Sequence, residues 1–264
     1  MASGAKAMSV AIKTTAELSI MAESGRRLIQ ILKQLKSHII PGMSLKSLDQ
    51  LARAATKELG GRPSFLHYHG YPAAICTSVN QGIVHCIPND YQLQAGDLVS
   101  VDFGFCYEGW HTDAAVTWIV ETDLHNYLPL LKGVYRALVA GAGVVKAGVK
   151  VGEISRAIET SLNHDNLTIM RQFVGHGVGR ELHEEPTIPN FVGHDKNVVL
   201  PAGCTIAIEP IAGVGQEVYT TLPDQWSVLA TDNQPVAHFE QTLVVLRGGS
   251  QILTPIQEIL GFTP

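Results

Sequence analysis

Two aspartates near the middle of the chain follow apolar, strand-like segments and could bind metal together. Asp102 ends the apolar run of residues 98–102, and Asp113 lies beyond a turn that contains Glu108 and Gly109. A hairpin centred near residues 107–108 would place the two aspartates opposite each other, with Cβ atoms roughly 4.5–5.5 Å apart. Carboxylates so close repel each other unless they share a proton or a metal ion. The alternative is that one of them caps the turn and is solvated.

A glycine-rich segment, residues 175–186, carries two further candidates, His176 and His183. Its glycines lack the strand-to-helix setting and the acidic residue of a dinucleotide-binding loop. Its His-Glu-Glu-Pro sequence also differs from the zinc-binding HExxH helix, because Pro186 would break such a helix. The segment therefore offers two imidazoles on a tightly bending backbone, although either could be a structural histidine.

Two glutamates, Glu209 and Glu240, also interrupt apolar strand-like stretches. They complete a set of four carboxylates and one imidazole: Asp102, Asp113, His176, Glu209 and Glu240. Oxygen-rich ligands with a single nitrogen suit divalent ions such as Mn, Fe, Co or Zn better than a thiolate-bound structural zinc would. Two such ions can polarise a carbonyl group and generate hydroxide from water, so the set indicates hydrolysis.

The segments that must position these residues alternate between helical and strand-like patterns. A Thr-x-x-Glu capping box at residues 14–17 begins an amphipathic helix that Pro41-Gly42 ends, and Ser44 caps a second helix that ends at Gly60-Gly61. Apolar periodicity predicts two more helices, at residues 127–145 and 151–162. Short β-branched runs predict strands within residues 73–120 and at residues 205–211, 226–230 and 242–246.

The order helix, helix, strands occurs twice, and the two halves align weakly. Gly42 and Gly148 have similar neighbours at an offset of 106 (148 − 42), and Asp102 and Glu209 at an offset of 107 (209 − 102). We therefore interpret residues 11–264 as a single catalytic domain with two pseudo-equivalent halves. Residues 1–10 are interpreted as a tail, of which residues 1–7 would be an addition to the gene product.

The composition indicates a globular protein. Of 264 residues, 45% are apolar and 16% charged, and the mean hydropathy is +0.13, which excludes a disordered polyelectrolyte. A net charge of −5 without a basic block disfavours nucleic-acid binding. No apolar run is long enough to span a membrane, and four cysteines without CxxC spacing predict free thiols. We expect a cytoplasmic monomer that binds neither nucleic acid nor a membrane.

These motifs together resemble the methionine aminopeptidases, in particular their type I branch. The resemblance covers residues 11–253 and is carried by Tyr68-His69-Gly70-Tyr71-Pro72, Val84-His85-Cys86-Ile87-Pro88, Val101-Asp102, His111-Thr112-Asp113, residues 176–186, Ile208-Glu209-Pro210 and Phe239-Glu240-Gln241-Thr242. It implies an α+β pita-bread fold in which two related halves with an antiparallel sheet enclose a dinuclear site for Co, Mn, Fe or Zn. The implied activity is removal of the N-terminal methionine from peptides and nascent chains, preferably before a small second residue, with ribosome contact left open.

The resemblance also implies individual roles. Asp102 would chelate one ion, Asp113 and Glu240 would bridge both, and His176 and Glu209 would complete the second. A metal-bridging water would attack the scissile carbonyl, with Glu209 as the proton carrier, His183 on the carbonyl and His85 on the amine. The substrate pocket would comprise Phe65, Tyr68, His69, Tyr71, Cys76, His85, His183 and Trp226.

Three residues depart from the best-known bacterial pattern of this family. Phe65 stands where a cysteine often lines the pocket, Leu182 where phenylalanine is common, and Ile211 where methionine follows the Glu-Pro pair. All three remain apolar, so we expect methionine selectivity to survive with an altered pocket shape.

Two other functions remain open. A proline-directed aminopeptidase or prolidase shares the fold and the metal set, but usually carries an extra N-terminal domain, whereas the helical pattern here begins by Thr14. A non-catalytic interaction protein of the same fold would be expected to have lost ligands, but all five candidates are present. The lack of a preceding cysteine cluster, and of a long insertion between His183 and Glu209, favours type I.

Overall fold

The structure, a computed structural model, describes residues 10–264 apart from the side chains of residues 194 and 195. The predicted tail lies outside this range, except for Val10. Within the described range, no helix combines the length and the apolar character needed to cross a membrane.

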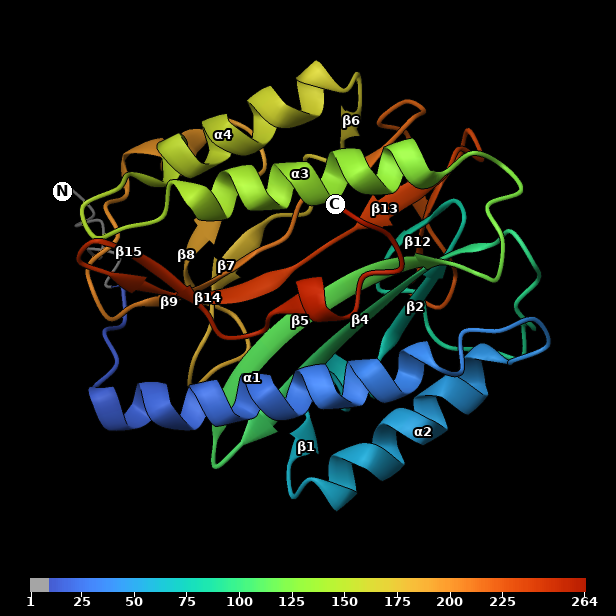
Figure 1. The fold of residues 1–264 in the computed structure, drawn as a ribbon, viewed down its shortest axis with the longest axis horizontal. Coiled ribbons are helices and arrows are strands. Elements are labelled where there is room, and N and C mark those ends of the chain that lie inside the picture. The colour runs from blue at the N-terminus through green and yellow to red at the C-terminus, as the bar shows by residue number, and fades with distance from the viewer. Residues whose placement is uncertain (1–9) are drawn as a thin grey trace, which may run out of the picture.

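Four long helices cover the strands on two sides: α1 (Thr15–Lys36), α2 (Leu45–Glu58), α3 (Leu128–Gly143) and α4 (Val151–His164). Figure 1 shows α1 and α2 on one side of the strands and α3 and α4 on the other. All four predicted helices are present, although the first ends at Lys36 rather than at Pro41-Gly42. Thr14 and Glu17 form the predicted capping box of α1, and the Ser44 hydroxyl accepts a hydrogen bond from the Ser47 backbone N–H at the start of α2.

The strands of residues 10–264 form four antiparallel sheets. Two short helices lie in connections between strands, η1 (Tyr68–Gly70) and η2 (His194–Asn197), and a third, η3 (Ile256–Glu258), follows the last strand. The first sheet contains β1 (Arg62–Pro63), β2 (Cys76–Val79), β4 (Leu98–Tyr107) and β5 (Trp110–Ile119). The second contains β6 (Thr168–Ile169), β10 (Ile211–Gly213) and β13 (Val236–His238), and the third contains β3 (Gly82–Val84), β11 (Tyr219–Thr221) and β12 (Val228–Ala230). The fourth contains β7 (Gly175–Gly177), β8 (Glu184–Ile188), β9 (Thr205–Ile208), β14 (Gln241–Leu246) and β15 (Gly249–Ile252).

Two predicted strands differ from the structure in their extent. The run predicted at residues 205–211 divides into β9 and β10, because Glu209 and Pro210 interrupt it. Proline has no backbone N–H to donate to a neighbouring strand, which accounts for the break. The run predicted at residues 226–230 begins as a strand only at Val228.

The hairpin of β4 and β5 corrects the predicted pairing of the two aspartates. Asp102 lies opposite Ala115, and Asp113 lies opposite Gly104. Glu108 and Gly109 both have positive φ (50° and 78°) and form a two-residue turn, so the hairpin is centred between them rather than near residues 107–108. The prediction that the aspartates face each other directly was wrong. They are diagonal neighbours on one face, because their partners on the opposite strand are two residues apart.

The backbone repeats one arrangement in the two halves of the chain. The N–H of Gly42 donates to the carbonyl of Leu93, and the N–H of Gly148 donates to the carbonyl of Leu200. Both glycines have a φ near 90° (86° and 89°), a conformation that a side chain would strain. The predicted relation between the halves is therefore present in the hydrogen bonding as well as in the sequence.

A continuous apolar core lies between the helices and the sheets. It includes fully buried side chains from both halves, such as Leu32, Phe103, Val134 and Ile206. Burial of this apolar surface is the main favourable contribution to the free energy of folding. It holds the strands in place and thereby fixes the positions of the residues at their ends. A smaller apolar cluster, composed of Phe65, Tyr71, Ala73, Cys76 and Leu182, lies apart from this core.

Candidate active site

The residues selected from the sequence meet in one cavity of about 240 Å³. All thirteen residues predicted to bind metal, act in catalysis or bind substrate line it, together with Leu182: Phe65, Tyr68, His69, Tyr71, Cys76, His85, Asp102, Asp113, His176, His183, Glu209, Trp226 and Glu240. They come from strands and loops spread over much of the chain, so only the fold brings them together.

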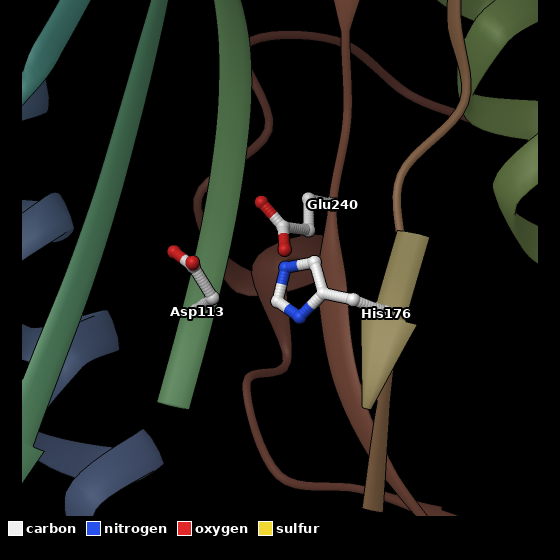
Figure 2. A group of neighbouring side chains, drawn as sticks. All are labelled: Asp113, His176 and Glu240. Atoms are coloured by element: carbon white, nitrogen blue, oxygen red, sulfur yellow. The ribbon is translucent and has the colours of Figure 1, made fainter. Parts of the chain in front are cut away.

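Three of the predicted ligands form a compact group. Asp113 from β5, His176 from β7 and Glu240, just before β14, each offer one ligand atom, and these atoms lie within 4.8 Å of one another. Figure 2 shows the three side chains gathered at one place, with the Glu240 carboxylate next to the His176 ring. Ligand atoms at these separations can surround a single ion.

The His176 ring has its two nitrogens in different environments. Nδ1 lies 2.8 Å from the carbonyl oxygen of Gly177, which can only accept a hydrogen bond. The proton of the neutral ring is therefore on Nδ1, and the Nε2 lone pair faces the carboxylates. A lone pair held in this way by a backbone carbonyl is the usual arrangement of a metal-binding histidine.

The remaining two candidates, Asp102 and Glu209, border this group. Asp102 lies on β4, close enough to Asp113 for its charge to raise the pKa of that carboxyl. Glu209 follows β9, and its Oε1 lies 3.7 Å from Nε2 of His176. Oδ1 of Asp102 and Oε1 of Glu240 are buried without a hydrogen-bond partner. The structure thus brings all five candidates to one place.

Burial and mutual repulsion make this cluster electrostatically unusual. Burial raises the pKa of Asp113 well above its usual range, and the charges of Asp102 and Glu209 add to the effect. Burial also raises the pKa of Glu209 and of Glu240, with further contributions from neighbouring carboxylates. For His176, burial and then the charge of His183 lower the pKa to about 3.

The crowding and burial of these side chains fit a site for divalent metal. Four carboxylates crowd together, two of their oxygens are buried without a donor, and the imidazole lone pair points at them. Such an arrangement is costly unless protons or cations neutralise it. The donors are oxygen and nitrogen, with no thiolate, which suits Mn, Fe, Co or Zn in a catalytic rather than a structural site.

Another part of the cavity lining is apolar. Phe65, Tyr71, Cys76 and Leu182 pack together there, with Trp226 beside them. The Tyr71 hydroxyl is 3.0 Å from the carbonyl of Ile75, to which it donates, and its ring meets Trp226 edge-on at 5.1 Å. These contacts fix the shape of the wall, because an aromatic ring anchored at its polar end has little freedom to move.

Two histidines stand between the acidic and the apolar walls. Nδ1 of His183 lies 2.9 Å from the Tyr68 hydroxyl, and its ring meets that of His176 edge-on at 4.3 Å. Desolvation, followed by repulsion from His85 and His69, lowers the pKa of His183 to about 4, so the ring is neutral near pH 7. His85 lines the same cavity, with its ring edge-on to that of Trp226.

Comparison with known proteins identifies the family. Residues 19–247 match the sequence profile of metallopeptidase family M24. The chain belongs to this family. Over 244 residues, this M24 metallopeptidase is 39% identical to methionine aminopeptidase 1 of Bacillus subtilis, an alignment that covers 92% of this chain and 98% of that protein.

Solved structures place this M24 metallopeptidase in the fold predicted from its sequence. The crystal structure of methionine aminopeptidase from Thermotoga maritima superposes with a TM-score of 0.90 at 35% identity, over 93% of this chain and 99% of that one. Prolidase from Pyrococcus furiosus matches with a TM-score of 0.73 at 21% identity, over 92% of this chain and 65% of that one, and shares the fold alone. The α+β pita-bread fold is confirmed, and the enzyme is a metallopeptidase that binds divalent metal.

One residue next to the predicted ligands of the metallopeptidase, His238, was not among the candidates predicted from the sequence. His238 is buried, and its Nε2 lies 3.7 Å from Oε2 of Glu209 and 3.9 Å from Oε2 of Glu240. A signal for it exists in the sequence, because His238 precedes Glu240 by two residues in a strand-like stretch. Alternate residues of a strand share one face, so a ligand at position 240 directs attention to position 238.

Proposed function

We propose that this M24 metallopeptidase removes the N-terminal methionine from peptides and nascent chains, preferably where the second residue is small. One observation carries the proposal: a single cavity has a buried acidic cluster on one wall and an apolar aromatic cluster on another. The acidic wall can hold metal beside a scissile amide, while the apolar wall accepts an unbranched thioether side chain. The 39% identity to a methionine aminopeptidase supports the same substrate.

Five side chains would hold two divalent ions in this proposal: Asp102, Asp113, His176, Glu209 and Glu240. The ions, which could be Co, Mn, Fe or Zn, would polarise the scissile carbonyl and lower the pKa of a water nucleophile. Asp113 and Glu240 would be shared between the two ions. The mutual proximity of Asp113, His176 and Glu240 supports this arrangement.

We assign the proton transfer to Glu209. Its side chain is 13% exposed, whereas that of Glu240 is 3% exposed, so the Glu209 carboxylate is the one that reacting groups in the cavity can reach. Glu209 would take a proton from water and pass it to the leaving amine, as a general base and then a general acid.

The two histidines between the walls would orient the substrate. Because the Tyr68 hydroxyl occupies Nδ1 of His183, Nε2 is the ring nitrogen left to meet the substrate carbonyl and the negative charge that develops on it. His85 would position the substrate amine and the scissile amide. Phe65, Tyr68, His69, Tyr71, Cys76 and Trp226 would complete the methionine pocket, with Leu182 in its wall.

The cytoplasm is the location we propose. Cys76, Cys86, Cys106 and Cys204 are all buried and unpaired, which suits a reducing compartment.

Release of free methionine from a Met-Ala-Ser peptide tests the function. The protein is stripped with a chelator and assayed before and after Mn²⁺ or Co²⁺ is restored, beside an Ala-Pro-Ser peptide. Metal-dependent cleavage of the first peptide alone is expected. Cleavage of the proline peptide instead would indicate a prolidase-like specificity, and failure on both by folded, metal-loaded protein would indicate a binding protein.

A further inference from the structure

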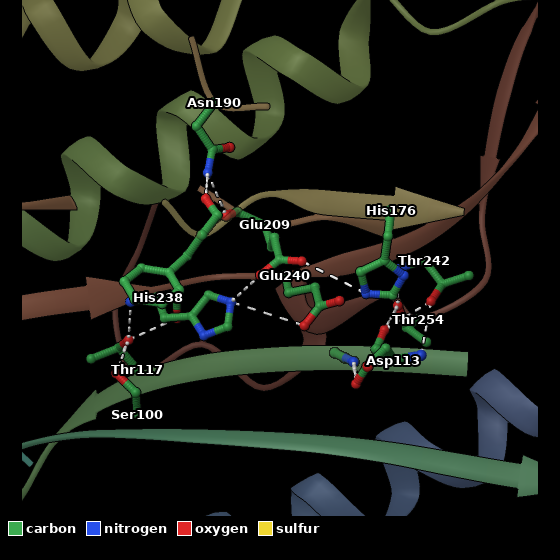
Figure 3. A network of polar contacts seen from close by, with 12 residues as sticks. Ser100, Asp113, Thr117, His176, Asn190, Glu209, His238, Glu240, Thr242 and Thr254 are labelled. Carbon is green, nitrogen blue, oxygen red and sulfur yellow. Dashed lines mark hydrogen bonds and ion pairs between the residues drawn. The ribbon is translucent and has the colours of Figure 1, made fainter. Parts of the chain in front are cut away.

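The His238 imidazole is directed into the acidic cluster but has no partner there. Its side chain is 3% exposed, and Nε2 is buried without a hydrogen bond. Figure 3 shows the ring between Glu209 and Glu240, with Nε2 facing a carboxylate oxygen of each. Both separations are slightly longer than a hydrogen bond, so a small displacement of either side chain would close the contact.

The main chain of His238 is held firmly from the neighbouring strand. The Thr117 hydroxyl accepts a hydrogen bond from the His238 N–H and donates one to its carbonyl, both at 2.8 Å. The same hydroxyl lies 2.8 Å from that of Ser100, as Figure 3 shows. Pairing with Ile211 of β10 holds the same stretch of main chain, so the direction of the imidazole does not depend on Thr117 alone.

The repeat places His238 at the position that Asp113 occupies in the first half. The N–H of Gly96 donates to Val120, and that of Gly203 donates to Val245, so the later strands of the two halves correspond at an offset of 125 (245 − 120). Asp113 lies opposite Gly104, and His238 lies opposite Ile211, which is the counterpart of Gly104 at the offset of 107. One half thus presents a carboxylate to the cluster where the other presents an imidazole.

Glu209 needs a donor that His176 cannot supply. Its Oε1 faces Nε2 of His176, but that nitrogen carries a lone pair because the proton of the ring is on Nδ1. Its Oε2 faces Nε2 of His238, which can carry a proton. A lone pair on Nε2 of His238 would face two carboxylate oxygens and be repelled, so the tautomer with a proton on Nε2 is favoured.

We infer that His238 is a positioning residue of the metal centre, whose Nε2–H holds the carboxylates of Glu209 and Glu240 in the orientation that binds metal. This inference rests on the ligand set proposed above. Ligating carboxylates usually receive hydrogen bonds from residues that do not touch the ion, and loss of such a partner typically weakens metal binding about 10–100-fold. His238 is not among the residues that line the cavity, so its proposed effect acts through Glu209 and Glu240.

Calorimetric titration of Mn²⁺ into metal-free protein tests this role. His238→Leu should weaken the binding by about 10–100-fold, whereas His238→Gln, whose amide nitrogen reaches the position of Nε2, should bind nearly as wild type does. If His238→Leu does not fold, His238→Asn carries the same expectation, because its amide falls short of the carboxylates. Unfolding temperatures of the metal-free proteins establish that the variants are folded.

Thr117→Val is the matched control, since it removes the hydrogen bonds to the His238 backbone but keeps the imidazole. It should lower the unfolding temperature and leave Mn²⁺ affinity near the wild-type value. Equal weakening in Thr117→Val, or in His238→Gln, would overturn the inference, because loosening of the strand rather than donation from Nε2 would then be the cause.

Asp113→Asn separates failure of this inference from failure of the proposed centre. If Asp113→Asn loses affinity and His238→Leu does not, the ligand set stands and the role of His238 is wrong. If Asp113→Asn also binds Mn²⁺ as wild type does, the proposed centre itself is wrong, and the inference falls with it.

Discussion

In the first half of the chain, β4 and β5 are joined by the two residues Glu108 and Gly109, whereas the corresponding strands of the second half are joined by a long excursion. That excursion runs from Val214 to Pro235, between β10 and β13, and contains β11 and β12. Asp102 and Glu209 occupy equivalent places on the strands that lead into these two connections, at the offset of 107. The shared backbone arrangement therefore supplies one carboxylate from each half, which meet in the cavity.

The difference between the halves lies in what surrounds these carboxylates. The short turn leaves no room for further side chains, so the first hairpin contributes Asp102 and Asp113 on a rigid pair of strands. The excursion carries Trp226 into the apolar wall, and β12 within it pairs with β3 of the first half. In this molecule, the repeated scaffold accounts for the acidic cluster, and the unequal connection contributes to the substrate pocket.

The largest effect on activity is expected from a substitution that distinguishes Glu209 from its counterpart Asp102. Glu209→Gln should retain the fold but lower kcat by about 10²–10⁴-fold, because the group that moves the proton is lost. Methionine release and thermal unfolding measure the two quantities. Asp102→Asn should act through metal affinity alone, so excess Mn²⁺ should restore part of its activity but not that of Glu209→Gln, which also lacks the proton-transfer group. A Glu209→Gln enzyme within about tenfold of wild type would contradict the assignment.

A somewhat smaller effect is expected at His183, which has no counterpart among the acidic residues of the first half. His183→Ala should lower kcat by about 10²–10³-fold, the typical loss of one donor to a developing oxyanion, while metal content stays constant. Steady-state kinetics and metal analysis of the same preparation measure both. The matched control is His125→Ala, an exposed histidine outside the cavity. A parallel loss of bound metal would instead make His183 a ligand.

Asp113→Asn sharpens the comparison between Asp113 and its counterpart His238. The amide keeps the shape of the side chain but removes the charge that two ions would share, so occupancy should fall at least as much as the roughly 10–100-fold typical of losing an outer partner. Metal analysis after dialysis against limiting Mn²⁺ checks this. Full retention of both ions would rule out a bridging role.

The smallest effect is expected at Gly104, whose counterpart in the second half is Ile211. A Cβ at Gly104 would lie 2.6 Å from Cβ of Ser64 and 2.8 Å from Phe65, so Gly104→Ala should lower the free energy of unfolding by about 1–3 kcal/mol. Because Phe65 lines the cavity, KM for methionyl peptides should change as well. Gly143→Ala in α3, where a Cβ meets nothing within 4 Å, should be neutral or stabilising by about 0.4–1 kcal/mol. Chemical denaturation distinguishes the two variants.

The local sequence was sufficient for elements whose signals are short-range. The capping residues Thr14 and Ser44 begin α1 and α2 as predicted, because a cap depends on residues within one turn. The hairpin was predicted from the turn residues, but its register was misplaced. Register depends on the φ angles of Glu108 and Gly109, which composition alone leaves open.

His238 shows a second limit of the sequence. Its spacing from Glu240 suggests a shared face of a strand but not what that face meets, and His238 lay outside the motifs that carried the family resemblance. Only the pairing of β13 with β10, and the break at Glu209 and Pro210, direct the imidazole toward Glu209 and Glu240. The position becomes visible when the two halves are compared through their backbone hydrogen bonds.

The sequence by itself determined the helices, the candidate ligand types, the repeat and the family, because these depend on residue identity and on spacing along the chain. The tertiary structure decided which atoms meet: the diagonal placement of Asp102 and Asp113, the lone pair of His176 and the approach of His238. Distances between residues far apart in the chain follow from the packing of the core, to which buried side chains in all parts of the protein contribute.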